Sequence, residues 1–177
     1  MEQLRQTKPI LAVKKKNKHK NKRTEGTQGR STKTKTPVAV LVGRNGNVRA
    51  KKVADVSKKT LQTNIRENID ESAQIMTDEW TAYQGLDQSF SRHGVVDHRK
   101  GEYANGDIYT NTAESWISLH KRGIVGTFHH VSDKHLDRYV NEFGFRWDNR
   151  KIEDGVRAIS AIKATEGKRL FYKEPIE

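Results

Sequence analysis

An acid at Glu114 and a base at Lys121 stand seven residues apart in the stretch YTNTAESWISLHKRGIVGT, residues 109 to 127. The apolar residues Trp116, Ile117 and Leu119 between them favour a short helix. Because a seven-residue step on an α-helix drifts by only about 20°, the carboxylate and the ammonium share one face, two turns apart. That separation is too long for a simple surface ion pair.

A second carboxylate, Asp78, follows the short apolar run AQIMT at residues 73 to 77, which predicts a buried strand. Strand ends in mixed α/β sheets expose side chains to ligands. Asp78 and Glu114 could therefore converge on a hard divalent cation, Mg²⁺ or Mn²⁺, that also binds phosphate oxygens. A pair of such ions can activate a water or a 3′-hydroxyl for in-line attack on a phosphodiester, and Lys121 would then neutralise a phosphate.

Each of these residues also has a purely structural explanation. A single carboxylate such as Asp78 is usually solvated or caps the next helix, and Glu114 near a helix start interacts favourably with the helix dipole. Other residues have ordinary explanations too: caps for Asn111 and Thr112, packing or phosphate contacts for His93, His98, His129 and His130, and core positions for Trp80 and Trp116.

The net charge of the 177-residue chain is +12, from 34 Lys and Arg against 22 Asp and Glu, and such a field attracts polyanions, above all nucleic acid. The absence of cysteine excludes disulfides, thiolate catalysis and a Cys-based zinc site, and fits a reducing compartment. No apolar run is long enough to cross a bilayer. We expect a cytoplasmic protein without membrane contact.

Residues 14 to 36 carry ten Lys or Arg, one acid and no apolar side chain, which predicts a basic flexible loop. The residues expected to contact DNA phosphates are Lys14, Lys15, Lys16, Lys18, Lys20, Lys22 and Arg23, together with Lys121 and Arg122.

The pattern PVAVLVGRNGNVRAKKV, residues 37 to 53, predicts a β-hairpin that turns at Asn45-Gly46. Ser57 can cap a helix whose apolar stripe is Leu61, Ile65 and Ile69. Three further elements are expected before residue 112: a helical turn through Trp80 and Tyr83, a strand at roughly 90 to 98, and a long loop at 99 to 111. An amphipathic helix is expected from Ser132, with Leu136, Tyr139, Val140 and Phe143 on one side. A last helix is expected at 154 to 165, through Val156, Ile159 and Ile162. This order indicates a mixed α/β protein.

Three blocks together resemble the catalytic region of bacterial insertion-sequence transposases of the DDE type: TDEWTAY at 77 to 83, NTAESWISLHKRGIVGTFHHVSDKHLDRYVNEFGFRWDNR at 111 to 150, and PVAVLVGRNGNVRAKKVADVSKKTL at 37 to 61. The resemblance covers most of residues 14 to 150. It is to the family whose complete members carry a zinc ribbon and a helix-turn-helix ahead of the catalytic domain, so this chain is interpreted as N-terminally truncated.

The resemblance implies an RNase H-like mixed sheet flanked by helices and Mg²⁺-dependent cleavage and joining of DNA strands. The implied partners are transposon ends, target DNA, and further copies of the chain or an intact transposase. The implied location is the bacterial cytoplasm, at the nucleoid when the protein is bound to DNA. By position, Asp78 matches the second acid of the catalytic triad, Glu114 the third, and Lys121 the basic residue that follows. Because some relatives use Asn as the third ligand, Asn111 is an alternative.

The first acid of the triad has no counterpart, since residues 1 to 13, MEQLRQTKPILAV, contain only Glu2. The first core strand is therefore expected to be altered or missing, although the apolar segment 9 to 13 could pair in its place. The expected organisation is an atypical N-terminus at 1–13, the basic loop at 14–36, the catalytic domain at 37–150, and a C-terminal helix and tail at 151–177.

A frameshift would explain the missing acid. Residues 1 to 15 can be back-translated so that the same bases, grouped two positions later, encode GTIAADETYIGGKE. This product contains a sequence typical of the family, DETYIGG, with its acid. Our hypothesis is that residues 1 to about 15 are read out of frame, and codons at the locus that are incompatible with the shifted reading would refute it.

Three functional hypotheses follow. The first is a transposase catalytic domain that is defective because one carboxylate is absent. The second is a non-catalytic protein that binds DNA without sequence preference. The third is the product of a decaying gene with no maintained role.

Overall fold

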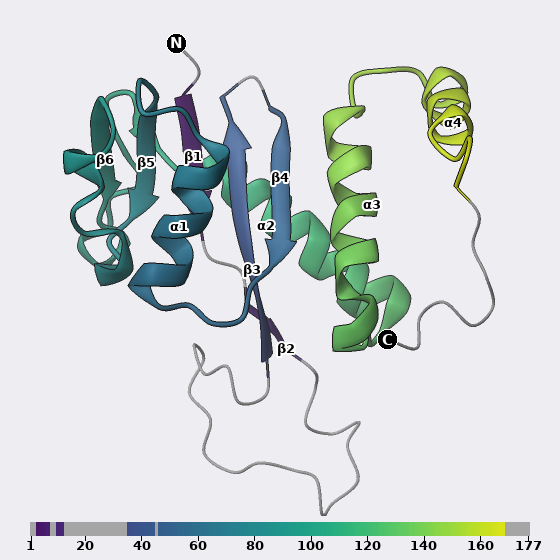
Figure 1. Ribbon diagram of the computed structural model, residues 1–177, viewed down its shortest axis with the longest axis horizontal. Helices are drawn as coiled ribbons and strands as arrows, with labels where there is room; N and C mark the ends of the chain where they lie inside the picture. Colours follow the sequence, from purple (N-terminus) through teal and green to yellow (C-terminus); the bar gives the residue numbers. More distant parts are fainter. Residues whose placement is uncertain (1–2, 8–9, 13–34, 45, 169–177) are drawn as a thin grey trace, which may run out of the picture.

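A mixed six-stranded sheet lies at the centre of the molecule, and the computed structural model describes residues 3–7, 10–12, 35–44 and 46–168. Its strands are β1 (Gln3–Thr7), β2 (Ile10–Ala12), β3 (Lys35–Gly43), β4 (Val48–Lys52), β5 (Gln74–Asp78) and β6 (Arg92–Val96). The order across the sheet is β4, β3, β1, β5, β6, with β2 also paired to β3 (Figure 1). β1, β5 and β6 are mutually parallel, whereas β3 runs antiparallel to its neighbours. The predicted mixed α/β class is confirmed.

The first core strand is present, and it comes earlier in the chain than the substitute segment suggested by the sequence. Residues Gln3–Thr7 form the strand between β3 and β5. Part of the substitute segment 9–13 does pair, because Ile10–Ala12 lies against the first residues of β3. The central strand is therefore formed by polar residues that precede the apolar segment, and the apolar segment forms the separate short strand β2.

The predicted hairpin is confirmed, with a loop one residue longer than the tightest turn. The Gly46 amide donates to the Gly43 carbonyl at 2.8 Å, and the Gly43 amide donates to the Asn47 carbonyl at 2.8 Å. Gly46 has a φ of +97°, which a residue without Cβ adopts at no steric cost. This geometry matches the three-residue hairpin loop that ends in a glycine bulge.

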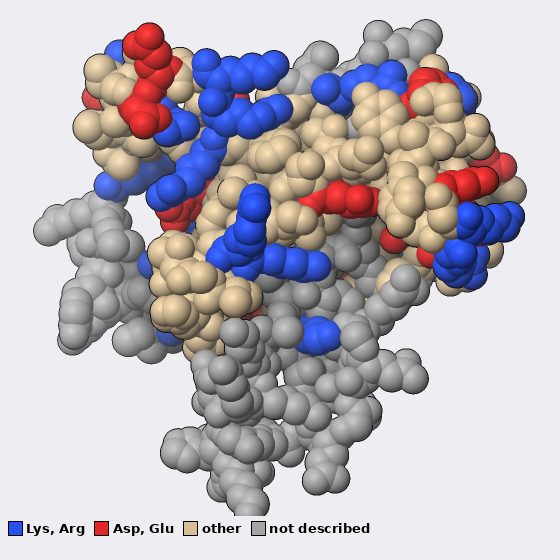
Figure 2. Space-filling model, turned by 180° about the vertical axis from the view of Figure 1, so that it is seen from behind, with Lys and Arg blue, Asp and Glu red and all other residues tan. Residues whose placement is uncertain are grey.

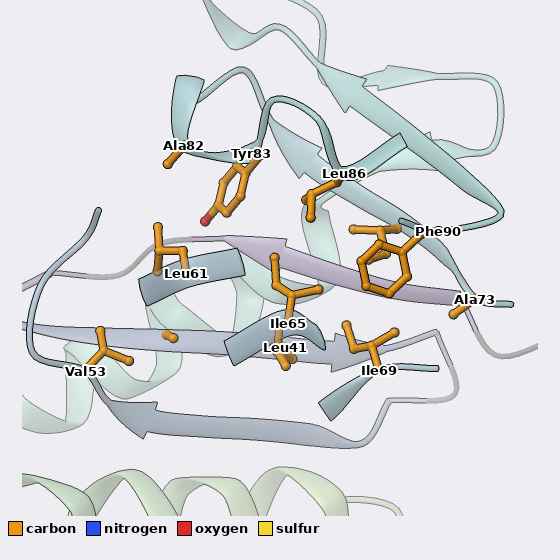
Figure 3. Close-up of a cluster of buried hydrophobic side chains, with 12 residues drawn as sticks. Leu41, Val53, Leu61, Ile65, Ile69, Ala73, Ala82, Tyr83, Leu86 and Phe90 are labelled. Atoms are coloured by element: carbon orange, nitrogen blue, oxygen red, sulfur yellow. The ribbon is translucent and has the colours of Figure 1, made fainter. Parts of the chain in front are cut away.

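Helix α1 (Lys58–Asn68) covers one face of the sheet, and it begins where the sequence predicted. The Ser57 side chain accepts a hydrogen bond from the Thr60 amide at 3.3 Å, which satisfies one of the free amides of the first turn. The apolar stripe of α1 packs on the sheet and on the segment after β5, as Figure 3 shows. The buried members of this cluster are Ala39, Leu41, Val53, Leu61, Ile65, Ile69, Ala73, Ile75, Ala82, Tyr83, Leu86 and Phe90.

Helices α2 (Asn111–Arg122) and α3 (Leu136–Asp148) form a second core with the other face of β3. Because side chains of a strand alternate between faces, Val38, Val40 and Val42 belong to this core whereas Ala39 and Leu41 belong to the first. The remaining buried members are Val48, Ala113, Trp116, Ile117, Ile124, Leu136, Val140 and Phe143. β3 is thus buried on both sides.

Helix α3 protects the free edge of β4. The Asp148 carboxylate accepts a hydrogen bond from the Val48 amide at 2.8 Å, and the Asp137 carboxylate accepts one from the Lys52 amide at 2.9 Å. Unpaired amides on an edge strand would otherwise be free to pair with another chain. Burial raises the pKa of Asp148, and the bond from Val48 opposes that shift.

The predicted loop at 99–111 contains structure that the sequence analysis missed. A single turn, η6 (His98–Lys100), follows β6, and a small hairpin then forms from β7 (Ala104–Asn105) and β8 (Ile108–Tyr109). Its turn includes Gly106, with a φ of +61°. The Asn-Gly pair at 105–106 is the same signal that predicted the first hairpin.

Helix α4 (Asp154–Lys163) confirms the last predicted helix, but its apolar stripe is not buried. Val156, Ile159 and Ile162 are each at least half exposed. Besides η6, the described residues contain four short helical segments: η4 (Thr81–Tyr83) and η5 (Leu86–Gln88) after β5, η7 (Gly123–Phe128), which continues α2, and η8 (Asp133–His135), which precedes α3. No helix among the described residues is long and apolar enough to cross a membrane.

Candidate active site

Four carboxylates line a cleft of about 400 Å³ beyond the carboxyl ends of β5 and β6. Asp78 is the last residue of β5, Glu79 follows it, and Asp97 follows β6. The carboxyl ends of two parallel strands meet at one edge of a sheet, which explains why these residues gather. The other lining residues include Asp87, Trp80, Tyr83, His93 and Arg99. A cleft with this many acids stands out in a chain whose net charge is +12.

Asp78 is half-buried at the carboxyl end of β5, and its carboxylate accepts a hydrogen bond from the Trp80 amide at 3.3 Å. The hydroxyl of Tyr83 is buried close by and makes no hydrogen bond to the described residues. Burial raises the pKa of Tyr83 well above its ordinary range, and the negative charge of Asp78 adds to the effect. Tyr83 is therefore neutral at any physiological pH.

Glu114 stands in the first turn of α2, held by two contacts. The Thr110 hydroxyl donates a hydrogen bond to Glu114 Oε1 at 2.8 Å, and His98 Nε2 lies 3.1 Å from the same oxygen. Thr110 itself is fully buried. The carboxylate position is thus set by the turn that precedes the helix and by the segment after β6.

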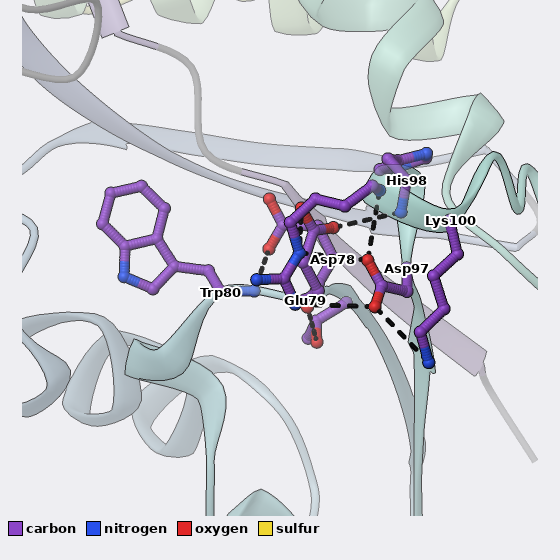
Figure 4. Close-up of polar contacts among 8 residues, drawn as sticks. Asp78, Glu79, Trp80, Asp97, His98 and Lys100 are labelled. Atoms are coloured by element: carbon purple, nitrogen blue, oxygen red, sulfur yellow. Dashed lines mark hydrogen bonds and ion pairs between the residues drawn. The ribbon is translucent and has the colours of Figure 1, made fainter.

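His98 joins Glu114 to the acidic cleft. Its backbone amide donates to Glu79 Oε2 at 3.3 Å, so one residue contacts both Glu79 and Glu114. Figure 4 shows Asp78, Glu79, Asp97 and His98 gathered at this edge of the sheet, with the Trp80 ring directed away from them. Glu114 is not among the residues that line the cleft and reaches it through His98.

Two cations lie at the exposed rim of the cleft, next to its acids. Arg99 Nε lies 3.1 Å from Asp97 Oδ1 and 3.7 Å from Glu79 Oε1, and Lys100 Nζ lies 3.9 Å from Asp97 Oδ2. The hydrogen bond from the Arg99 side chain is the main cause that lowers the pKa of Asp97. Exposed fractions show the layering: 13% and 18% for the Glu79 and Asp97 side chains, against 72% and 74% for those of Arg99 and Lys100.

The other residues that the sequence singled out occupy the two ends of α2. Asn111, the alternative ligand, is exposed at the first helical position, and Lys121 and Arg122 are exposed in the last turn. α2 lies on the side of the sheet seen in Figure 2, where a group of Lys and Arg side chains stands near the centre. The basic residues Lys14, Lys15, Lys16, Lys18, Lys20, Lys22 and Arg23 lie outside the described residues.

β1 brings no acid to the site, because residues Gln3–Thr7 include neither Asp nor Glu. Its register is informative nonetheless. Gln6 pairs with Thr77 of β5 in the parallel ladder, so Thr7 is level with Asp78. In the described part of the chain, no group of three or more His, Cys, Asp or Glu side chains is placed to hold one metal ion.

The sequence analysis missed Glu79, Asp97 and the bridging role of His98. Asp97 follows an apolar strand in the same way as Asp78, so the same signal was available for it. The contacts of His98 and Glu79 depend on the pairing of β5 with β6, which no local pattern encodes.

Another missed residue is His120, which is fully buried in the second core. Its ring stacks on Trp116 with centroids 5.1 Å apart and is nearly perpendicular to the Phe143 ring, with centroids 5.0 Å apart. Neither ring nitrogen has a hydrogen-bond partner among the described residues. Burial lowers the pKa of His120 to about 4, with Lys121 as a smaller cause. The core position predicted for Trp116 is confirmed.

Comparison with known proteins places the chain in a family. The ISXO2-like transposase domain matches residues 11–148, which leaves β1 before the match and α4 after it. A protein in transposable element ISH50 of Halobacterium salinarum is 38% identical over 127 residues, covering 68% of this chain and 42% of that relative. The chain thus spans less than half of the relative's length. Because the family match covers most of this chain, the chain belongs to the ISXO2-like transposase domain family of insertion sequences.

Proposed function

We propose that this chain is the catalytic domain of an insertion-sequence transposase whose strand-transfer site has lost one acid. Asp78 and Glu114 are its two remaining metal-ligating acids, and Lys121 contacts a DNA phosphate. The observation that carries the proposal is the acidic cleft at the ends of β5 and β6, joined to Glu114 through His98 in a chain of this family. In the strand order, the β3–β4 hairpin lies on one side of β1 and the parallel pair β5–β6 lies on the other, which supports an RNase H-like fold.

The donors at this edge of the sheet suit a hard cation. Carboxylate oxygens are the ligands that Mg²⁺ and Mn²⁺ prefer, and Asp78 and Glu114 would hold the ion. A bound divalent cation would supply charge stabilisation for in-line displacement at a phosphodiester. The donor set agrees in chemistry and is one ligand short, since β1 contributes no carboxylate.

The protein's own groups would position the reactants. Thr110 and His98 fix the carboxylate of Glu114. Lys121, two helical turns beyond Glu114, would bind a phosphate of the DNA strand held at the acids, and the neighbouring Arg122 would add a second positive charge. Asp97 and Glu79 restrain Arg99 at the rim of the cleft.

The position of the missing acid agrees with the frameshift hypothesis. In the shifted reading, the Asp codon takes the last base of codon 6 and the first two bases of codon 7. In the sheet, Gln6 is in register with Thr77 and Thr7 is level with Asp78. The acid of the shifted reading would therefore stand beside Asp78. Without it we expect strand transfer to fall by orders of magnitude.

Restoration of the acid tests the proposal. We would compare the natural chain with Thr7→Asp, Gln6→Asp and the double variant Thr7→Asp with Glu114→Gln, using nicking and strand transfer of a plasmid that carries the element's ends. Because successive residues of a strand face opposite sides of the sheet, a gain should come from one of the two single variants. We expect it from Thr7→Asp, dependent on Mg²⁺ or Mn²⁺ and abolished by Glu114→Gln.

The second candidate function is DNA binding without catalysis, which the net charge of +12 and the exposed Lys121 and Arg122 favour. It predicts binding that ignores Mg²⁺ and Glu114 but falls steeply with salt. If Thr7→Asp and Gln6→Asp both fold and bind DNA yet neither cleaves it in either metal, the catalytic proposal is wrong and this candidate replaces it.

A further inference from the structure

Tyr103 is the most exposed large apolar side chain next to the acidic cleft, with 67% of its surface accessible. The other exposed large apolar residues among those described are aliphatic: Val95, Val125, Ile152, Val156, Ile159 and Ile162. An aliphatic side chain has no flat face, whereas a tyrosine ring can stack on a nucleic-acid base. Tyr103 therefore differs from the rest of the exposed apolar surface in the ligand that it can bind.

The ring of Tyr103 is next to the residue that links the candidate catalytic acids. Its centroid lies 5.9 Å from that of His98, with a tilt of 52° between the planes. His98 in turn contacts Glu114 at 3.1 Å and Glu79 through its amide. A base stacked on Tyr103 would consequently lie one side chain away from the candidate reaction centre.

The hairpin that begins after Tyr103 is held in place by two arginines. Arg92 makes a paired contact with Asp107, at 2.8 Å and 3.1 Å, and Arg44 donates to the Asp107 carbonyl at 2.6 Å. Ile108 lies against the backbone of β6 at Gly94, where an added Cβ would come within 2.9 Å of it. The aromatic ring is thus directly followed by an anchored element, which restricts its backbone and reduces the entropy lost when a ligand binds.

Cations next to Tyr103 in the chain suit the backbone of the same ligand. The exposed side chains of Arg99 and Lys100 precede it in the turn η6, and Asp97 contacts both of them. An aromatic platform flanked by positive charges is the arrangement that binds single-stranded nucleic acid, by stacking the bases and pairing with the phosphates. Paired bases inside a duplex are already stacked and do not reach such a platform.

We propose that Tyr103, Arg99 and Lys100 form a binding surface for an unpaired DNA base and its phosphates beside the acidic cleft. This inference rests on the proposed function, since cleavage and joining of DNA strands create ends at which bases are unpaired. The inference adds a substrate preference to the proposed function: the chain binds DNA with a short single-stranded end more tightly than fully paired DNA.

Binding measured without cleavage tests this surface. The probes are a fluorescein-labelled 20-base-pair duplex with blunt ends and the same duplex with a three-nucleotide 3′ tail, titrated with the full chain in EDTA and followed by anisotropy. We expect the tailed duplex to bind about tenfold more tightly, from the stacking of one base. Tyr103→Ala and Tyr103→Leu should lose this preference and keep the affinity for the blunt duplex, and Tyr103→Phe should retain both.

A 2-aminopurine base in the tail gives a second readout. Its fluorescence should change on binding to the natural chain and to Tyr103→Phe, and remain that of free tail in Tyr103→Ala. Asn105→Ala, at an exposed position on the hairpin that follows Tyr103, is the matched control and should behave as the natural chain. Lys100→Gln should weaken the binding of both probes and reduce the salt dependence of the affinity.

Equal affinity of the natural chain for both probes, or a tail preference that survives in Tyr103→Ala, would overturn the proposal. Neither result depends on catalysis, because no divalent metal is present. If the tail preference is absent while Thr7→Asp gains metal-dependent cleavage, the proposed function stands and only the stacking surface fails. If the preference is present and neither Thr7→Asp nor Gln6→Asp gains cleavage, the surface belongs to a protein that binds DNA without cleaving it.

Discussion

His98 Nε2 lies 3.1 Å from Glu114 Oε1, so a residue of the turn after β6 restrains the carboxylate that opens α2. The same oxygen accepts the Thr110 hydroxyl at 2.8 Å. Both contacts are to Oε1, so Oε2 is the oxygen that we expect to bind a cation. The segment that connects β6 to α2 therefore sets both the place and the orientation of the predicted third acid.

Removal of the His98 side chain should weaken divalent-metal binding without unfolding the protein. Groups that orient a metal ligand typically change metal affinity by about 10- to 100-fold, whereas a partly exposed pair contributes less than about 1 kcal/mol to stability. We expect His98→Ala to bind Mn²⁺ about tenfold more weakly in electron paramagnetic resonance titrations, with a melting temperature close to that of the natural chain.

His98→Gln is the matched variant, because its side-chain amide nitrogen can reach toward Glu114 as Nε2 does. Partial recovery of Mn²⁺ affinity in this variant would support a positioning role. Mn²⁺ affinity in His98→Ala equal to that of the natural chain would show that Thr110 alone holds the carboxylate.

Lys121 should contribute about one phosphate contact to DNA binding. A side chain that neutralises one phosphate changes the slope of log affinity against log salt by about one unit. We expect Lys121→Gln to lower affinity on duplexes of any sequence and to reduce that slope by about one, measured by anisotropy between 50 and 200 mM salt. Lys163→Gln, an exposed position on α4, should have a smaller effect; an equal loss in both variants would mean that only net charge matters.

Much of this site could be predicted where the signal was local. Asn45-Gly46 predicted the hairpin, Ser57 the start of α1, and the run before Asp78 the strand that delivers it. What failed depends on pairing between distant segments. Asp97 joins Asp78 only because β6 pairs with β5, and the hairpin at 104–109 was interpreted as loop despite its own Asn-Gly signal.

The exposed stripe of α4 shows the limit of periodicity in the same physical terms. The spacing of Val156, Ile159 and Ile162 predicted a helix correctly, because spacing reports local geometry. Burial requires a partner surface at the right distance, and in the described part of the chain these three side chains have none that covers them.

Gly123 is required by a close approach of α3. A Cβ at this position would come within 2.0 Å of the Phe143 ring, and the backbone there is helical, so strain comes from the contact and not from φ. We expect Gly123→Ala to lower the free energy of unfolding by about 1–3 kcal/mol, as overpacked cores do. Urea denaturation followed by circular dichroism measures it.

Gly126 in the same segment η7 is the control, since nothing lies within 4 Å of an added Cβ. Gly126→Ala should leave stability unchanged or raise it by up to about 1 kcal/mol. If both variants are equally stable, Phe143 moves aside without cost and the contact with α3 is looser than described.

His120 should make the folded state sensitive to acid. Its folded pKa is about 4, against an ordinary value of 6.5, so below pH 6.5 the unfolded chain takes up a proton that the folded chain refuses. The stabilising contribution is complete above pH 6.5 and is lost as the pH falls toward 4. At pH 5 the free energy of unfolding of the natural chain should fall by about 2 kcal/mol relative to that of His120→Phe, on top of losses common to both.

Urea denaturation of both proteins at pH 7.5 and pH 5 measures the difference, and His129→Gln, which removes an exposed histidine, should follow the natural chain. Identical pH dependence in the natural chain and His120→Phe would show that water or a protein group reaches the ring and that His120 is protonated in the fold as easily as in the unfolded chain.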